Sequence, residues 1–308
     1  MCKHVVLIPM KTVDTAMQKK SCKPAMFGRA WLATRRALSL EHPAPHQFAC
    51  YQWQRGPRPP LGYVIYRWVL FLGVLCVGVS SFALQHLPPG YAGPVARVNY
   101  MKWFIYLTNW GYLVLVLQSG LALALAQRGR AERSLHLANE EDNSGMLRRR
   151  RTPLLCRVYW MSHTVATDLA LVITLVYWTL VHDPKIHEVN ALNLLVHGGN
   201  SVIIVVELAV TSHPVRMAHA LYGAGAGLLY GVFSALYWAL GGTDRLGARA
   251  IYPSLDWSRP GVAIGFVCLC AVVLVTAHAL AAALAGLRTR VAARLLPAPR
   301  EPFALPHH

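Results

Sequence analysis

The stretch NALNLLVHGGNSVIIVVELAV, residues 190–210, is long and apolar enough to cross a bilayer, yet it contains His197 and Glu207. A hydrocarbon core about 30 Å thick needs a helix of about 20 mostly apolar residues. Six segments meet that length: 63–84, 104–126, 158–181, 190–211, 218–240 and 261–287. The composition, 55% hydrophobic and 14% charged, is also typical of membrane proteins. We therefore predict an all-α integral membrane protein with six transmembrane helices.

The net charge of +17 is distributed unevenly among the segments outside these spans. Of the 30 Lys and Arg residues, 23 lie before the first span, after the sixth, or in the second and fourth connections. The other three connections hold 6, and Arg67 lies just inside the first span. By the positive-inside rule, both termini are predicted to be cytosolic. The basic segments would contact anionic membrane lipids, and the absence of an aromatic and basic platform disfavours nucleic-acid binding.

Three regions follow from this pattern. Residues 1–62 are basic and then Pro-rich, which predicts a mostly disordered cytosolic tail. Residues 63–287 form the transmembrane domain, and residues 288–308 form a cytosolic C-terminal tail. In the fifth span, Gly223, Gly227 and Gly231 are spaced by four, which predicts close helix packing within the chain or in a homo-oligomer.

Polar residues within the spans require an explanation, because an ionisable group at the centre of a bilayer costs about 2.5–3.5 kcal/mol on insertion scales. Five acidic or histidine residues lie clear of the span ends: His163, Asp168, His197, Glu207 and His278. A rise of about 1.5 Å per residue places His197 near the outer boundary, level with Thr108. His163, Glu207 and His278 fall near the inner side, with Asp168 between the two levels. Glu207 is ten residues beyond His197, so the two cannot be in contact.

Thr108 and His197 suggest a catalytic pair. A hydroxyl and an imidazole at the same depth can act as nucleophile and general base towards an ester carbonyl. Asn109, Gly198 and Asn200 are the candidate donors to the oxyanion that would form. Such chemistry needs no cofactor. The alternative is structural, with the Thr and His side chains bonding to backbone carbonyls or to each other.

The inner polar cluster, His163, Asp168, Glu207 and His278, is open to three interpretations. These residues could relay protons, bind a metal, or pair as buried charges. We favour pairing and predict no metal site, because the sequence contains neither His-x-x-x-His on one helix nor Cys-x-x-Cys.

Five motifs carry a family resemblance: WFIYLTNWG (103–111), NALNLLVHGGNSV (190–202), SHPVR (212–216), GGTD (241–244) and IYPSLDW (251–257). They resemble the rolling stone family of multi-pass membrane proteins, over residues 51–295. The family's namesake acts in myoblast fusion in insects. The resemblance therefore implies a role at the cell surface, and favours the plasma membrane over the endoplasmic reticulum.

The chain is also distantly similar to the androgen-induced and androgen-dependent hydrolases, which cleave fatty-acid esters of hydroxy fatty acids. Their nucleophile lies in a Trp-x-x-Leu-Thr type motif, matched here by FIYLT, which implies that role for Thr108. Their histidine follows Leu-Asn by four positions and precedes Glu by ten, as His197 follows Leu192 and Asn193 and precedes Glu207.

The chain departs from these hydrolases at three positions. Leu194 and Gly198 replace a further His and a small hydroxyl residue, and Asp168 stands where a proline is expected. We expect a Thr/His hydrolase of lipid esters within the membrane. The alternative function is a non-catalytic membrane organiser in cell fusion or adhesion, and a third is a proton or ion pathway through the inner cluster.

Overall fold

The computed structural model describes residues 26–56, 58–87, 92–95, 97–131, 152–184 and 189–296. The chain divides into two compact units between Ala37 and Leu38. In the first unit, helix α1 (Met26–Ala37) has Arg35 and Arg36 in its last turn. The remaining helices belong to the second unit. The first 25 residues of the predicted N-terminal tail lie outside the described residues.

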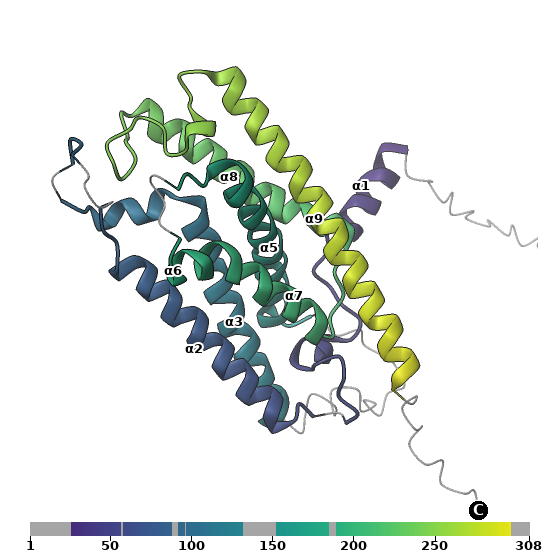
Figure 1. Ribbon diagram of the computed structural model, residues 1–308. Coiled ribbons are helices and arrows are strands. Elements are labelled where there is room, and N and C mark those ends of the chain that lie inside the picture. The colour runs from purple at the N-terminus through teal and green to yellow at the C-terminus, as the bar shows by residue number, and fades with distance from the viewer. Residues whose placement is uncertain are drawn as a thin grey trace, which may run out of the picture. The chain divides into compact units, whose positions relative to one another are not determined.

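The described residues contain six helices long and apolar enough to cross a membrane, as the sequence predicts (Figure 1). They are α2 (Leu61–Ala83); α3 (Leu107–Ala131); α5 (Leu154–Val176) with the π-helical η3 (Tyr177–Val181); α6 (Ala191–Leu194), the π-helical η4 (Leu195–Gly199) and α7 (Asn200–Val210); η5 (Met217–His219) with α8 (Ala220–Ala239); and α9 (Pro260–Leu295). Helix α9 continues through residues 288–295, which the sequence analysis placed in the C-terminal tail, and residues 297–308 of that tail are not described.

Two of these helices form the centre of the bundle. In α3 and α5, 56% of the 18-residue apolar stretch is buried, against 17–28% of the corresponding stretch in the other four spans. Helix α3 packs against α2 and α5, and α5 also contacts α7, α8 and α9. Figure 1 shows α2 and α9 on opposite sides of α5. The central position of α5 explains why Asp168 and His163, both on this helix, are fully buried.

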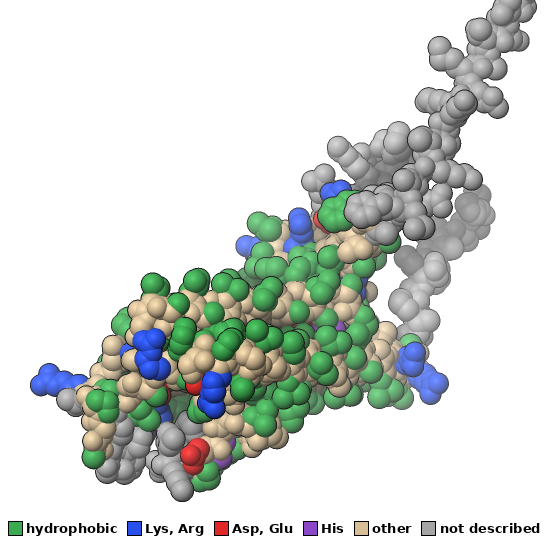
Figure 2. Space-filling view, turned by 90° about the horizontal axis from the view of Figure 1, so that it is seen from above, with side chains coloured by type: hydrophobic (Ala, Val, Ile, Leu, Met, Phe, Trp, Pro, Cys, Tyr) green, Lys and Arg blue, Asp and Glu red, His purple; other side chains and the backbone are tan. Residues whose placement is uncertain are grey.

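The peripheral helices expose apolar side chains. Val79 of α2, Leu228 of α8 and Val272 of α9 are each more than half exposed. In Figure 2, hydrophobic side chains cover most of the flank of the bundle. Such a surface is stable in contact with lipid chains, which agrees with six membrane-spanning helices.

The two ends of the bundle differ. At one end, called the pocket end, α2 ends and α3 and α9 begin. The connections there include the 3-10 helices η2 (Tyr100–Ile105) and η6 (Pro253–Leu255). The ammonium group of Lys102 bonds to the carbonyl and hydroxyl of Thr243. The Tyr230 hydroxyl donates to the Ile105 carbonyl at 2.9 Å. The Lys102 bonds join two connections that are far apart in sequence, and the Tyr230 bond joins α8 to η2.

At the opposite end, called the tail end, residues 38–56 and 58–60 contact the bundle. This segment, called the collar, contains the 3-10 helix η1 (Pro45–Ala49). Tyr51 forms an antiparallel bridge with Thr211, and the Gln52 amide donates to the Val210 carbonyl at 2.8 Å. Phe48 is buried. The sequence analysis placed these residues in a mostly disordered tail. They are packed because Phe48 and Tyr51 supply apolar contacts that the Pro-rich composition obscures.

The glycines of α8 have different surroundings. A Cβ atom at Gly223 would overlap the carboxyl group of Asp168, so this glycine permits a close approach between α8 and α5. A Cβ at Gly227 or Gly231 would meet nothing within 4 Å. A homo-oligomer formed through this helix stays a prediction.

Candidate functional site

A pocket of about 610 Å³ lies at the pocket end. It is enclosed by the end of α2, the start of α3, the segment η3, the helix pair α6 and η4, and the connection that contains Tyr252. Thr108 and His197 both line it. The structure therefore brings the two residues of the predicted catalytic pair to one pocket.

Thr108 is the second residue of α3 and is mostly buried. The Tyr252 hydroxyl accepts a hydrogen bond from the Leu107 amide at 3.0 Å and also interacts with Thr108. Burial raises the pKa of Tyr252 to about 12, so the phenol keeps its proton at neutral pH. The dipole at the N-terminus of α3 favours negative charge nearby. The Leu107 amide already donates to Tyr252, and the Asn109 and Trp110 amides donate to the Tyr106 carbonyl. Thr108 therefore lies where an anion formed at its side chain would be favoured.

His197 lies in the π-helical segment η4. Its ring stacks on Tyr177 of η3, with centroids 3.5 Å apart and an interplanar angle of 5°. Asn193 holds Tyr177 in place by donating to its hydroxyl at 2.6 Å. Two π-helical segments thus meet through these rings. Single π-helical turns occur frequently at functional sites, because they change the direction of side chains within an otherwise regular helix.

The predicted oxyanion donors are held by other contacts. Asn109 lines the pocket, but its side-chain amide donates to the Trp103 carbonyl at 2.6 Å. The Asn200 side chain accepts from the Thr174 hydroxyl at 3.0 Å and from the Ser201 amide at 2.7 Å. Neither Gly198 nor Asn200 is among the described residues that line the pocket.

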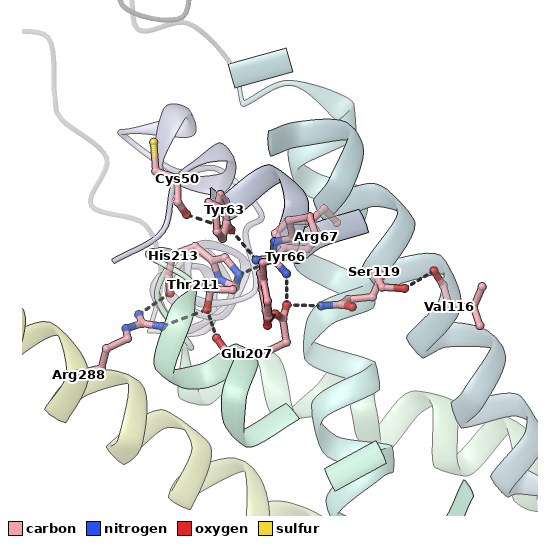
Figure 3. Close-up of polar contacts among 12 residues, drawn as sticks. Cys50, Tyr63, Tyr66, Arg67, Val116, Ser119, Glu207, Thr211, His213 and Arg288 are labelled. Carbon is pink, nitrogen blue, oxygen red and sulfur yellow. Dashed lines mark hydrogen bonds and ion pairs between the residues drawn. The ribbon is translucent and has the colours of Figure 1, made fainter. Parts of the chain in front are cut away.

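Glu207 forms a buried ion pair near the tail end. Its carboxylate accepts from Arg67 at 2.5 Å, from the Tyr66 hydroxyl at 2.7 Å and from Gln118 at 3.0 Å (Figure 3). Arg67 also donates to the Tyr63 hydroxyl at 2.6 Å. Both charged side chains are almost completely inaccessible to solvent. The structure therefore gives Glu207 a partner on α2, while the histidines grouped with it in the sequence analysis have other partners.

The sequence contains a signal for this pair. Arg67 is the seventh residue of α2, and Glu207 is the fourth from the end of α7. At about 1.5 Å per residue, both lie within about 10 Å of the tail end. Opposite charges at similar depth predict pairing. A count of Lys and Arg residues alone does not reveal this pair.

Asp168 and His278 form a second buried pair. Their Oδ1 and Nδ1 atoms are 2.8 Å apart, and His278 Nε2 lies 3.0 Å from the Arg216 carbonyl. A carbonyl only accepts, so Nε2 carries a hydrogen, and one further proton lies between Nδ1 and Oδ1. The pair is therefore neutral overall, whichever atom holds that proton.

His163 does not join either pair in the described residues. Its ring meets those of His213 and Tyr159 edge-on, with a centroid distance of 4.6 Å to His213. The predicted inner cluster is thus three separate groups. Within the described ranges, no three His, Cys, Asp or Glu side chains are placed to hold a metal ion.

Comparison with known proteins agrees with the sequence resemblance. The family model described as "Protein rolling stone" matches residues 32–295. The chain belongs to the rolling stone family. It is similar to the protein rolling stone of Drosophila melanogaster, with 29% identity over 226 residues that cover 70% of this chain and 73% of that protein. No solved structure matches the chain.

The matched range includes all six spanning helices, and the predicted family membership is confirmed. This rolling stone family member is thus a multi-pass membrane protein. The pocket, the Arg67–Glu207 pair and the Asp168–His278 pair all lie within the region that the family model matches.

Proposed function

We propose that this protein is a membrane hydrolase that cleaves lipid esters in the pocket, with Thr108 as nucleophile and His197 as general base. The observation that supports this most is the presence of both side chains in the lining of one pocket of about 610 Å³. That volume is within the range of small-molecule sites, about 300–1,000 Å³. Phe104 and Leu113, which lie four and five residues from Thr108 in the sequence, are exposed on the lipid-facing surface.

The proposed reaction has two steps. In the first, His197 accepts the hydroxyl proton as Thr108 Oγ1 attacks the ester carbonyl, and then gives that proton to the departing alcohol. An acyl-threonine remains. In the second step, His197 removes a proton from water as the water oxygen attacks the acyl group. His197 then gives this proton to Thr108 Oγ1 as the acyl–oxygen bond breaks, so the fatty acid leaves and both residues are regenerated. The N-terminus of α3 and the phenol of Tyr252 stabilise the oxyanion in both steps.

The charge distribution also supports an orientation of the bundle in the membrane. With 23 of the Lys and Arg residues on the side of the termini, the pocket end faces the cell exterior and both termini are cytosolic. The pocket then opens at the outer leaflet of the plasma membrane. Its substrate would be a lipid of that leaflet.

A second candidate function is a non-catalytic organiser in cell fusion or adhesion. The hydrogen bond from the Asn109 side-chain amide to the Trp103 carbonyl favours it, because that donor is already engaged. Asn200 is not among the described residues that line the pocket. The stacking of Tyr177 over one face of His197 also favours a structural role for the imidazole. In this case Thr108 and His197 would only pack the pocket end.

Ester turnover by the purified protein in proteoliposomes separates the two candidates. We expect wild type to hydrolyse a fluorogenic long-chain ester, and Thr108→Ala to lose this activity. His197→Ala should be slower by about 10²–10⁴-fold, the usual contribution of a general base. The double variant should be no slower than Thr108→Ala, because the two residues act as a unit.

Thr276→Ala is the matched control, because Thr276 is exposed on α9 and its hydroxyl bonds to the Val272 carbonyl of the same helix. This variant should keep the wild-type rate. Full turnover by Thr108→Ala would exclude the hydrolase mechanism. If wild type is inactive and the Thr108→Ala, His197→Ala double variant still supports cell fusion, the organiser function is favoured.

A further inference from the structure

A second hollow lies on the flank of the bundle, beside the pocket. It is a groove of about 250 Å³ between α2 and α3, and its wall is almost entirely apolar. Leu75, Val79 and Phe82 of α2 form one side, and Leu113 and Val116 of α3 form the other. Val79 is 58% exposed and Leu113 is 47% exposed, so the groove opens towards the lipid.

One side chain separates the groove from the pocket. Trp103 lines both. Its indole nitrogen donates to Ser81 Oγ at 3.1 Å, and Ser81 lines the pocket. On the other side, the Trp103 ring meets Phe82 and Phe104 edge-on, with centroid distances of 5.9 Å and 5.1 Å. Pocket and groove are therefore adjacent compartments; the pocket has a mixed polar and apolar lining, and the groove is almost entirely apolar.

The surroundings decide what fills the groove. It lies on two membrane-spanning helices, where the solvent is lipid hydrocarbon, so its occupant is an acyl chain. Moving a chain from the bilayer into an apolar groove gives no hydrophobic gain, because lipid tails are equally apolar. Specific retention therefore requires polar contacts for the head group. The adjoining pocket supplies them from Gln85, Asn193 and Arg245, among others.

We propose that the pocket and the groove together bind one membrane lipid, with an acyl chain in the α2–α3 groove and the ester and head group beyond Trp103 in the pocket. The ligand class is an amphiphile with one ordered chain and an uncharged, hydrogen-bonding head, such as a monoacylglycerol. The assignment of the ester to the pocket rests on the proposed function. The binding of the chain does not.

Photo-crosslinking tests this binding in the purified full-length protein in detergent micelles. The probe is a monoacylglycerol that carries a diazirine on its chain and a terminal alkyne. We expect the crosslinked peptides to come from the groove residues of α2 and α3. Val79→Trp, which fills the groove, should lower the labelling about tenfold, equivalent to about 1.4 kcal/mol of binding free energy.

Leu228→Trp is the matched control, because Leu228 is an equally exposed, lipid-facing residue on α8. It should be labelled like wild type. Leu113→Trp provides a second groove variant, so that misfolding of one does not decide the result. Equal labelling of wild type and both groove variants would overturn the proposal, as would crosslinks spread evenly over all lipid-facing helices.

The same variants separate this proposal from the hydrolase mechanism. Thr108→Ala should be labelled like wild type, because binding precedes chemistry. Groove variants should hydrolyse a short-chain ester normally and a long-chain ester slowly. If wild type shows no groove labelling but turns over the short-chain ester, only the lipid site is contradicted. Normal groove labelling without any turnover contradicts only the hydrolase.

Discussion

Arg67 and Glu207 are charged side chains placed where a bilayer protein tolerates charge poorly. Each is almost fully buried, and they contact each other at 2.5 Å. Tyr63, Tyr66 and Gln118 supply further hydrogen bonds. A buried ion pair is stable only when its remaining hydrogen-bonding groups are also satisfied, which these three residues achieve in large part. The pair links α2 to α7, which share few other polar contacts among the described residues.

Removal of one partner should therefore destabilise the bundle. We predict that Arg67→Ala or Glu207→Ala lowers the free energy of unfolding by about 3–5 kcal/mol, because an unpaired charge stays buried. The double variant Arg67→Met, Glu207→Leu should lie close to wild type or above it. Thermal unfolding in detergent measures all three.

Arg259→Ala is the control for this prediction. Arg259 pairs with Asp256 at 3.4 Å and is 67% exposed. Loss of an exposed pair changes stability by about 1 kcal/mol or less. If Arg67→Ala is as stable as Arg259→Ala, the buried pair has no structural role.

The sequence predicts which polar residues lie within the membrane spans, but it predicts their hydrogen-bonding partners only in part. Hydropathy marks Glu207, Asp168 and His278 as polar residues within spans, and the depth of each follows from the helix rise. The pairing of Asp168 with His278 also depends on which faces of α5 and α9 meet. That contact is allowed by Gly223 on a third helix, which no single span reveals.

The π-helical segments η3 and η4 were not predictable. The sequence indicated one continuous helix over 190–211, and the structure divides it into α6, η4 and α7. A π-helical turn alters backbone hydrogen bonding while leaving the apolar pattern almost unchanged, so hydropathy gives no sign of it. The site nevertheless depends on it, because η4 orients His197 against Tyr177.

The packing of the collar was not predictable from the sequence, for a different reason. Its composition is that of a disordered tail, but three aromatic or polar contacts hold it. Phe48 stacks on His213, with centroids 5.3 Å apart. The Ser212 hydroxyl donates to the Gln47 carbonyl at 2.6 Å, and Trp53 donates to the Ala209 carbonyl at 2.9 Å. Such long-range contacts override local composition.

The attachment of the collar should weaken in acid. His213 lies between α7 and α8, beneath Phe48, and burial lowers its pKa well below 6.5. The folded state therefore holds a neutral imidazole, whereas a released collar lets it bind a proton. Stability is then constant above about pH 6.5 and falls as the pH decreases below that value. Burial also lowers the pKa of His42, which acts in the same direction.

Hydrogen exchange measures this effect. We predict that amide protection factors in residues 47–53 fall between about pH 7.5 and about pH 5.5, and that His213→Phe reduces the fall, because it removes the larger titration. The amides of α5 provide the internal reference. Protection factors that are independent of pH would contradict a role for His213 in holding the collar.

The number of helices in the bundle is predictable from the lengths of the apolar segments. Six apolar segments long enough to span a bilayer predict six helices, and the structure contains them. Hydropathy does not tell which helices are central, because a lipid-facing helix and a buried one are both apolar. The central position of α3 and α5 depends on packing, and so does the pocket between the ends of four spans and the connection from α8 to α9.

The orientation of the bundle and the chemistry of the pocket can be measured together. A membrane-impermeant fluorophosphonate probe, applied to intact cells, reaches only sites that face the exterior. With the pocket end outside, we predict that the probe labels Thr108, as mapped by mass spectrometry of the modified peptide. Thr108→Ala should abolish the labelling, and Thr276→Ala should retain it. Labelling of Thr108 only after permeabilisation would contradict the orientation. Absence of labelling at Thr108 both before and after permeabilisation, or full labelling of Thr108→Ala, would contradict the hydrolase.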